Sequence, residues 1–329
     1  MWTTDRIIQN KLHMEKRALG NSGLEVAPLA FGGNVYGWSA DEKTSFRLLD
    51  EFVAKGFNLV DTADVYSRWV PGHQGGESES ILGRWLKDRG NRDKVIIATK
   101  VGADMGEGMN VSKSYILKHV EDSLQRLQTD YIDLYQTHYD NEVTPVEETL
   151  EAYDTLIKSG KIRAIGASNM SLARLLASLR ASESHGYPKY ETFQPLYNLY
   201  DREKYEQQYA DICVKSNISV ISYYSLASGF LSGKYRHAED TGKSAARGQK
   251  ALSYLTPRGI RILEALDVCA AKHTTTPAAI SLAWLLTRPA IAAPIASATN
   301  ITQLHELIHG VTMKLDQEDL ALLNKSSAY

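Results

Sequence analysis

Several short apolar segments of this chain end in a polar residue with a reactive side chain. Asp61 follows FNLV, Lys100 follows VIIAT, and His138 follows YIDLYQT. A carboxylate, an amine and an imidazole can transfer protons, and a lysine amine can also form a Schiff base with a carbonyl compound. Singly, each has an ordinary structural explanation: a turn residue, a solvated charge or a packed imidazole. Their shared position at segment ends is what favours a common site.

The apolar segments have the composition and spacing of buried parallel strands. They are rich in Val, Ile, Leu and Tyr, and they occupy 57–61, 95–100, 131–138, 162–169, 192–195, 219–224 and 291–297. Helical patterns occupy 41–55, 78–88, 113–127, 146–158, 171–182, 203–215, 257–272 and 277–287. The first six strands start 27 to 38 residues apart, close to the roughly 30 residues of a βα unit.

With one more strand near 26–31, the chain has the eight strands of a single (β/α)8 TIM barrel, an α/β fold. A doubly wound open sheet is the alternative. Asn21-Ser22-Gly23 predicts an N-terminal β-hairpin. The polar stretch SGFLSGKYRHAEDTGKSAARGQK after the strand at 219–224 predicts a long loop for substrate or cofactor. We expect residues 1–13 to be a disordered extension, and 14–329 to form one barrel domain.

The expected barrel brings its polar strand ends together, because all parallel strands open at one face. The residues concerned are Asp61, Lys100, His138, Ser168, Asn169 and Gln194.

Composition and absent motifs exclude several classes of protein. Lys plus Arg number 37 against 39 Asp plus Glu, a net charge of −2, which argues against binding to nucleic acid or to an anionic membrane. The sequence has no apolar run long enough to span a membrane and no signal-peptide core at its start, and its two cysteines, Cys213 and Cys269, are expected to be reduced and buried, so we expect a cytoplasmic protein. It has no G-x-G-x-x-G motif of the Rossmann type, and no H-E-x-x-H or C-x-x-C motif, so no metal site is expected.

The ordered motifs resemble those of the aldo-keto reductases from about Glu15 to about Leu323. VDTADVY at 60–66 is similar to the family segment with the catalytic Asp and Tyr, here Asp61 and Tyr66. ATK with Lys100 and QTHYD with His138 match the other two catalytic positions, and GESESILG at 76–83 resembles the start of the family's next helix. GKIRAIGASN, FQPLYN and SYYSLASGFLSGKY resemble its cofactor-binding stretches. Details are closest to the branch with bacterial reductases and potassium-channel β-subunits.

The resemblance implies reduction of an aldehyde or ketone to an alcohol by hydride transfer from NADPH, with NADH less favoured. Tyr66 would be the proton donor, and Lys100 would favour its phenolate, while Asp61 would keep Lys100 charged. His138 would donate a hydrogen bond that orients the carbonyl oxygen of a small-molecule substrate.

The resemblance also implies a set of cofactor contacts. Ser168, Asn169 and Gln194 would bind the carboxamide, and Tyr223 would stack on the nicotinamide ring. The full set is Gly33, Asn34, Asp61, Ser168, Asn169, Gln194, Tyr223, Leu226, Ser228, Leu231, Gly233, Lys234, Ser297, Thr299, Gln303 and Glu306. The chain departs from the family pattern at Ser225 and Leu307, and the segment 295–304 holds no Lys or Arg for the 2′-phosphate.

Two other hypotheses about the function remain open. A nicotinamide-binding regulatory or interaction subunit would keep the fold with little or no turnover, and a barrel aldolase would use Lys100 as a Schiff-base amine. On the loops that would shape the substrate pocket, Tyr36, Trp38 and Trp69 could form an aromatic wall. We interpret Arg68 and His73 as polar residues of solvated loops rather than as contacts for an acidic substrate.

Overall fold

The computed structural model describes residues 14–244 and 246–329, and in them the apolar segments form an eight-stranded parallel sheet. The strands are β3 (Ala30–Gly32), β4 (Leu59–Asp61), β5 (Ile96–Val101), β6 (Ile132–Thr137), β7 (Ile162–Ser168), β8 (Tyr190–Gln194), β9 (Ser219–Val220) and β10 (Ile295–Ala296). Their order is β10-β3-β4-β5-β6-β7-β8-β9. Hydrogen bonds from Ala292 N to Val220 O and from Ile295 N to Ser222 O join the two edges. The predicted (β/α)8 barrel is confirmed.

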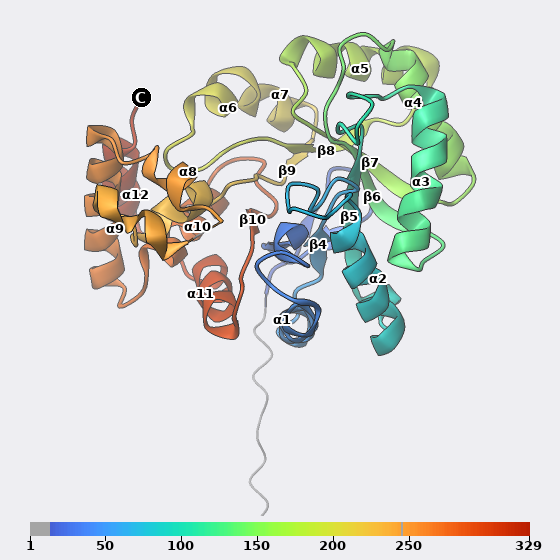
Figure 1. The fold of residues 1–329 in the computed structure, drawn as a ribbon. Helices are drawn as coiled ribbons and strands as arrows, with labels where there is room; N and C mark the ends of the chain where they lie inside the picture. The colour runs from blue at the N-terminus through green and yellow to red at the C-terminus, as the bar shows by residue number, and fades with distance from the viewer. Residues whose placement is uncertain (1–13, 245) are drawn as a thin grey trace, which may run out of the picture.

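Helices surround the sheet, as Figure 1 shows. Those anticipated from the sequence are α1 (Glu42–Ala54), α2 (Glu77–Arg89), α3 (Lys113–Leu127), α4 (Val146–Lys158), α5 (Leu172–His185), α9 (Pro257–Lys272) and α10 (Pro277–Leu286). Local signals fix their ends: the Asp41 carboxylate accepts the backbone N–H of Thr44 at 2.8 Å. Gly56 follows α1 at φ +89°, a conformation that favours glycine.

The helix expected over 203–215 is wrong as one element. It is divided into α6 (Glu203–Gln208) and α7 (Ala210–Lys215) at Tyr209, whose φ is −118°. The ring of Tyr209 stacks on Phe193 at 4.8 Å, and its hydroxyl donates to Met170 O at 3.0 Å. These contacts with the β7 and β8 side of the barrel hold the backbone away from regular helix.

The structure has further elements that the sequence reading did not anticipate. The long loop contains the 3-10 turns η3 (Ala227–Ser232) and η4 (Ala238–Lys243) and the short helix α8 (Gly248–Leu252). Two more 3-10 turns, η1 (Gly33–Val35) and η2 (Arg92–Lys94), lie nearer the N-terminus. Helices α11 (Ile301–Thr312) and α12 (Gln317–Ser326) complete the chain.

The predicted hairpin is formed by β1 (Arg17–Ala18) and β2 (Glu25–Val26). Its side chains Leu19, Leu24 and Val26 are buried in one cluster with residues from the lower interior of the barrel. Because that cluster includes Leu59, Ala98 and other interior strand residues, the hairpin closes the end opposite the strand C-termini. Residues 1–13, expected to be a disordered extension, lie outside the described residues.

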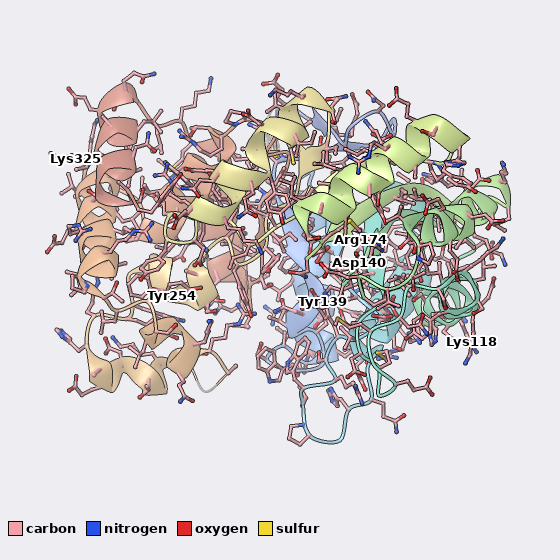
Figure 2. The ribbon with its side chains drawn as sticks, turned by 90° about the horizontal axis from the view of Figure 1, so that it is seen from above. Lys118, Tyr139, Asp140, Arg174, Tyr254 and Lys325 are labelled. Atoms are coloured by element: carbon pink, nitrogen blue, oxygen red, sulfur yellow. The ribbon has the colours of Figure 1, made fainter. Side chains whose placement is uncertain are left out.

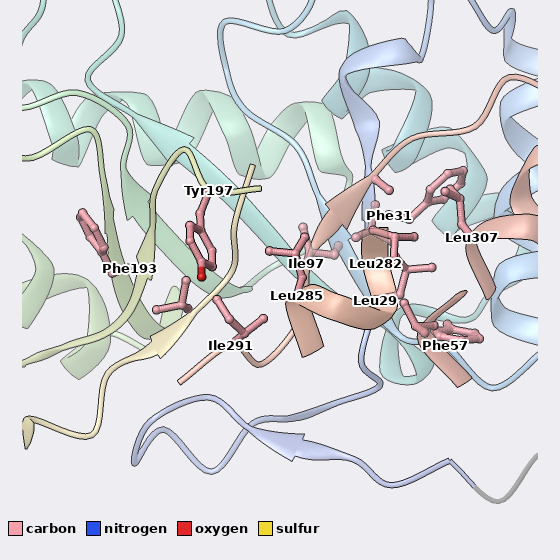
Figure 3. Close-up of a cluster of buried hydrophobic side chains, with 14 of the residues drawn as sticks. Leu29, Phe31, Phe57, Ile97, Phe193, Tyr197, Leu282, Leu285, Ile291 and Leu307 are labelled. Atoms are coloured by element: carbon pink, nitrogen blue, oxygen red, sulfur yellow. The ribbon is translucent and has the colours of Figure 1, made fainter. Parts of the chain in front are cut away.

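The two-residue period of a strand positions the polar groups. Leu59 belongs to the interior cluster and Asp61 is the next residue on the same side; Ala98 and Lys100 stand in the same relation on β5. Apolar residues therefore fill the lower interior, and polar ones follow at the strand ends. The intervening residues pack outward against the helices: Phe31 of β3 stacks on Phe52 of α1 with ring centroids 5.1 Å apart, and Figure 3 labels Phe31 and Ile97 among the buried side chains of this core.

A glycine allows α2 to lie close to α3. A Cβ on Gly83 would stand 2.1 Å from Arg126 O and 2.8 Å from the Leu127 Cα, so no larger residue fits without movement of the backbone. This close packing matters for the site because α2 also carries Ser78 and Glu79, whose side chains are buried against the strand ends.

We expect Gly83→Ala to lower the free energy of unfolding by about 1–3 kcal/mol, because the added methyl group overpacks the α2–α3 contact. Urea denaturation followed by circular dichroism measures it. The control is Gly242→Ala, where the new Cβ meets nothing within 4 Å. Equal stabilities of the two variants would contradict the packing argument.

Candidate active site

Lys100 lies at the centre of the polar strand ends. Its Nζ donates to Asp61 Oδ2 at 2.7 Å, to Thr62 O at 2.7 Å and to the Tyr66 hydroxyl at 3.3 Å. The side chain is fully buried. All three N–H groups of the ammonium thus have acceptors, which is how a protein can hold a charge away from water.

The Asp61 carboxylate is held from its other side by amides. Gln194 Nε2 donates to Asp61 Oδ1 at 2.9 Å, and Gln136 Nε2 reaches the same oxygen at 3.3 Å. Gly166 makes room for these groups, since a Cβ there would lie 2.2 Å from Thr192 Oγ1 and 3.0 Å from Gln136 Cγ. Gln136 was not singled out from the sequence, although it lies on β6 two residues before His138.

Tyr66 lies on the turn after β4 and is fixed through its backbone. Its carbonyl oxygen accepts the N–H groups of Gly76 and Ser78 at 3.0 and 3.2 Å, at the start of α2. Ser78 Oγ also donates to Gly33 O at 2.8 Å and pairs with Thr62 Oγ1 at 2.7 Å. The segment GESESILG therefore supports the position of Tyr66.

His138 is brought beside Tyr66, with the two ring centroids 5.9 Å apart. Its backbone oxygen accepts from Asn169 Nδ2 at 3.1 Å, and its ring stacks on that of Tyr139 at 4.7 Å. The loop that follows is tied down by Asp140, which accepts from Arg174 Nε at 2.5 Å and Nη2 at 2.9 Å. In Figure 2 the labels of Asp140 and Arg174 lie side by side, with Tyr139 nearby.

The electrostatic states of these groups follow from burial and from each other. Burial opposes a charge on Lys100, but Asp61 and Tyr66 outweigh it and raise the pKa of the amine, so Lys100 is an ammonium. Burial, aided by the Lys100 charge, lowers the pKa of His138 well below its usual value, so this imidazole is neutral at pH 7.

For Tyr66, burial raises the pKa by more than Lys100 lowers it. The hydroxyl is therefore protonated at neutral pH. Lys100 limits this rise, because its charge and its hydrogen bond lower the pKa of Tyr66, the direction expected of a group that favours the phenolate.

A cavity of about 1,140 Å³ opens above these side chains. Tyr66, His138 and Asp61 line it, whereas Lys100 is not among the lining residues. The predicted cofactor residues that line it are Asn34, Asp61, Ser168, Asn169, Gln194, Tyr223, Leu226, Ser228, Lys234, Ser297, Thr299, Gln303 and Glu306. Tyr223 donates its hydroxyl proton to Asn169 Oδ1 at 2.9 Å, so two of these residues are directly joined.

Three of the predicted cofactor residues do not line the cavity. Gly33 is buried with its carbonyl bound to Ser78, and Leu231 is fully buried in the core. Gly233 ends η3 at φ +79°, packed near Arg236 and Pro277.

Part of the cavity is lined by cations, and of these only Lys234 was predicted from the sequence. Lys243, Arg247 and Lys250 also line it. The Arg247 atom Nη2 is buried and has no hydrogen-bond partner in the described structure. Thr276 and Pro277, at the N-terminus of α10, border the same space. Lys243 also pairs with Asp240 at 2.7 Å. Cations beside a helix N-terminus form a binding place for phosphate groups.

Asp64 is a buried carboxyl group in the same turn, two residues before Tyr66. It is 1% exposed, and neither carboxyl oxygen has a hydrogen-bond partner among the described residues. Burial and the nearby Glu79 raise the pKa of Asp64 to about 8. Asp64 is therefore protonated and uncharged at neutral pH.

No group of three or more His, Cys, Asp or Glu side chains within 14–244 and 246–329 is arranged to hold a metal ion. In the same ranges, none of the helices combines the length and the apolar character that a membrane span requires. Both cysteines, Cys213 and Cys269, are buried free thiols.

Comparison with known proteins places the chain in a family. Residues 28–328 match the model of the aldo/keto reductase family. The chain is 34% identical to the uncharacterized oxidoreductase YrpG of Bacillus subtilis, covering 94% of this chain and 95% of YrpG. It is 32% identical to the aldo-keto reductase YhdN of the same bacterium, over 94% and 93% of the two chains. Protein tas of Escherichia coli is 30% identical, over 94% and 96%.

The raised pKa of Asp64 predicts a pH-dependent stability. Between about pH 4 and pH 8 the folded state retains a proton that the unfolded state releases, so the free energy of unfolding falls as pH rises, by up to about 1.4 kcal/mol per pH unit. Asp64→Asn removes this dependence, so its stability relative to wild type increases from pH 5 to pH 8. Urea denaturation at several pH values tests this, with Asp93→Asn as a control at an exposed carboxylate. Parallel pH curves for Asp64→Asn and wild type would refute the assignment.

Proposed function

Because the chain belongs to the aldo/keto reductase family and is an oxidoreductase, we propose that it reduces an aldehyde or ketone to an alcohol with NADPH, and that Tyr66 donates the proton. The observation that carries this proposal is the Lys100 ammonium bound at once to the Asp61 carboxylate and the Tyr66 hydroxyl. It puts a protonated phenol at the cavity surface with a fixed positive charge behind it.

The chemistry that this arrangement serves is a balanced addition of a hydride and a proton. When bound, the cofactor supplies the hydride to the carbonyl carbon. The π electron pair then moves to the carbonyl oxygen. This oxygen takes the proton from Tyr66 and becomes the hydroxyl group of the alcohol. Lys100 stabilises the negative charge that Tyr66 acquires, and solvent restores its proton.

Neutral His138 has a separate task. A neutral imidazole carries one N–H, so it can donate a hydrogen bond to the carbonyl oxygen without giving up a proton. Its stacking on Tyr139 and its backbone bond to Asn169 hold the ring beside Tyr66. His138 thus orients the carbonyl, while Tyr66 remains the only acid.

The cavity fits a nicotinamide dinucleotide in chemistry. Asn169 and Ser168 offer amide and hydroxyl groups near Tyr66 for the carboxamide, and Tyr223 offers an aromatic face. Lys234, Lys243 and Arg247 offer positive charge for the diphosphate, and the buried Nη2 of Arg247 without a partner supports an anion there. The diphosphate is common to NADPH and NADH, and 295–304 holds no Lys or Arg for the 2′-phosphate, so a preference for NADPH requires that one of the cations after β9 reaches that phosphate.

The aldolase reading is weakened by the position of Lys100. A Schiff base requires a neutral amine that a carbonyl carbon can reach, whereas this amine is fully buried, has three acceptors and is charged. If the protein is a regulatory subunit, it should bind the cofactor without turnover. The following experiment distinguishes this hypothesis from that of an active reductase.

We expect Tyr66→Phe to reduce kcat by about 10²–10⁴-fold with little change in the Kd for NADPH, because only the proton donor is lost. Lys100→Met should be similarly damaging. Oxidation of NADPH in the presence of 4-nitrobenzaldehyde measures turnover, and tryptophan fluorescence measures binding. Near-normal turnover in Tyr66→Phe would contradict the assignment of Tyr66 as the proton donor. Binding without turnover by the wild type, over a broad panel of carbonyl compounds, would favour the regulatory subunit.

A second prediction concerns the cationic lining. Arg247→Met should raise the Kd for NADPH by about 10-fold or more, since a charged hydrogen bond contributes about 1.5–3 kcal/mol. Lys118→Met, which removes an exposed charge on α3 outside the cavity, is the control. Fluorescence titration gives both constants. An unchanged Kd in Arg247→Met would mean that this guanidinium does not contact the cofactor.

A further inference from the structure

Exposed aromatic side chains gather around Tyr66. Trp69, Tyr139 and Tyr224 are 47%, 38% and 44% exposed, and all three line the cavity. Large aromatic rings left in water are costly, and a group of them on one concave surface indicates an apolar partner.

Each ring rests on a residue of the site. Trp69 meets Tyr66 edge-to-face at 5.5 Å and Trp38 at 5.7 Å. Tyr139 stacks on His138, and Tyr224 packs against Tyr223 at 5.4 Å. A flat molecule whose carbonyl oxygen reaches Tyr66 would therefore have aromatic walls along its body.

One carboxylate besides Asp61 lines this part of the cavity. Asp104, on the loop after β5, lines the cavity, and its carboxylate accepts the backbone N–H groups of Gly106 and Gly108 at 2.7 and 2.9 Å. These bonds lower the pKa of Asp104, so it remains ionised. Arg68 lies beside Asp104: its Nη1 donates to Asp104 O at 2.7 Å, and its charge further lowers the pKa of that carboxylate, but Arg68 itself does not line the cavity.

The cations of the cavity lie on a different segment. Lys234, Lys243, Arg247 and Lys250 follow β9, whereas Trp38, Trp69, Asp104 and Tyr139 lie on the loops after β3, β4, β5 and β6. Arg247 interacts electrostatically with Tyr224 and Tyr66, which partly offset the lowering of its pKa by burial. Under the proposed function its charge is matched by the cofactor's phosphates, which leaves Asp104 as the fixed charge beside the substrate.

We propose that this site selects its substrate by charge: it takes flat, uncharged carbonyl compounds whose apolar body lies against Trp69, and Asp104 disfavours those that carry an anion. This inference rests on the proposed function and specifies its substrate class. Trp69 and Asp104 are specificity-determining residues with no part in the hydride or proton transfer.

The test uses two aldehydes of similar shape that differ in charge, methyl 4-formylbenzoate and 4-formylbenzoate, with propanal as a small aldehyde without an aromatic body. Wild type should show kcat/KM at least 10-fold higher for the ester than for the carboxylate. Asp104→Asn should lower this ratio about 3-fold. Added salt should also lower the ratio in the wild type, because it screens the charge of Asp104. Trp69→Ala should lower kcat/KM for the ester about 10-fold while that for propanal changes little.

Val143→Ala is the matched control, since Val143 is 85% exposed but lies outside the cavity. The Kd for NADPH of each variant reports whether the fold and the cofactor site are intact. Equal rates for the two aromatic aldehydes, or a preference for the carboxylate that Arg247→Met abolishes, would overturn the inference while leaving carbonyl reduction standing. Failure of the wild type to reduce any of the three aldehydes, or any member of the broad carbonyl panel, would overturn the proposed function itself, and this inference with it.

Discussion

The site depends on one buried charge. An ammonium group removed from water is stable only where acceptors replace its hydration, and Lys100 has three: the Asp61 carboxylate, the Thr62 carbonyl and the Tyr66 hydroxyl. Loss of any one would leave part of the charge unpaired. The requirement therefore fixes the end of β4, the turn that follows it and the end of β5 relative to one another.

The barrel meets this requirement through the alternation of its strands. The residues that precede Asp61 and Lys100 on the inward side are apolar, and with the hairpin they fill the lower interior. Gln136 and Gln194 complete the layer at the strand ends, where Gly166 leaves them space. The polar layer is thus supported from below by a packed apolar one, and Tyr66, the proposed proton donor, stands on a rigid base.

Two sets of loops line the cavity above this layer, and they carry different kinds of side chain. The segment after β9 and the start of α10 carry the cations and the helix end suited to phosphate, which are the needs of a dinucleotide. The loops after β3 to β6 carry Trp69, Tyr139 and Asp104, so the proposed substrate would meet aromatic faces and a carboxylate. Chemistry common to the family can therefore stay constant at the strand ends while these loops alter the choice of substrate.

Local sequence determined the elements and the order of the chemical groups, because helix and strand periods, caps and turns act over a few residues. The hairpin at Asn21-Ser22-Gly23, the cap at Asp41 and the polar endings at Asp61 and Lys100 are of this kind. Only the tertiary structure decided what depends on distant neighbours. Tyr209 interrupts a helical pattern because Phe193 and Met170 bind it, Gln136 joins the site through the register of β6, and Arg247 enters the cavity from a polar loop. The protonation of Asp64 and Tyr66 is likewise set by burial, which exists only once the strands, loops and helices have packed together.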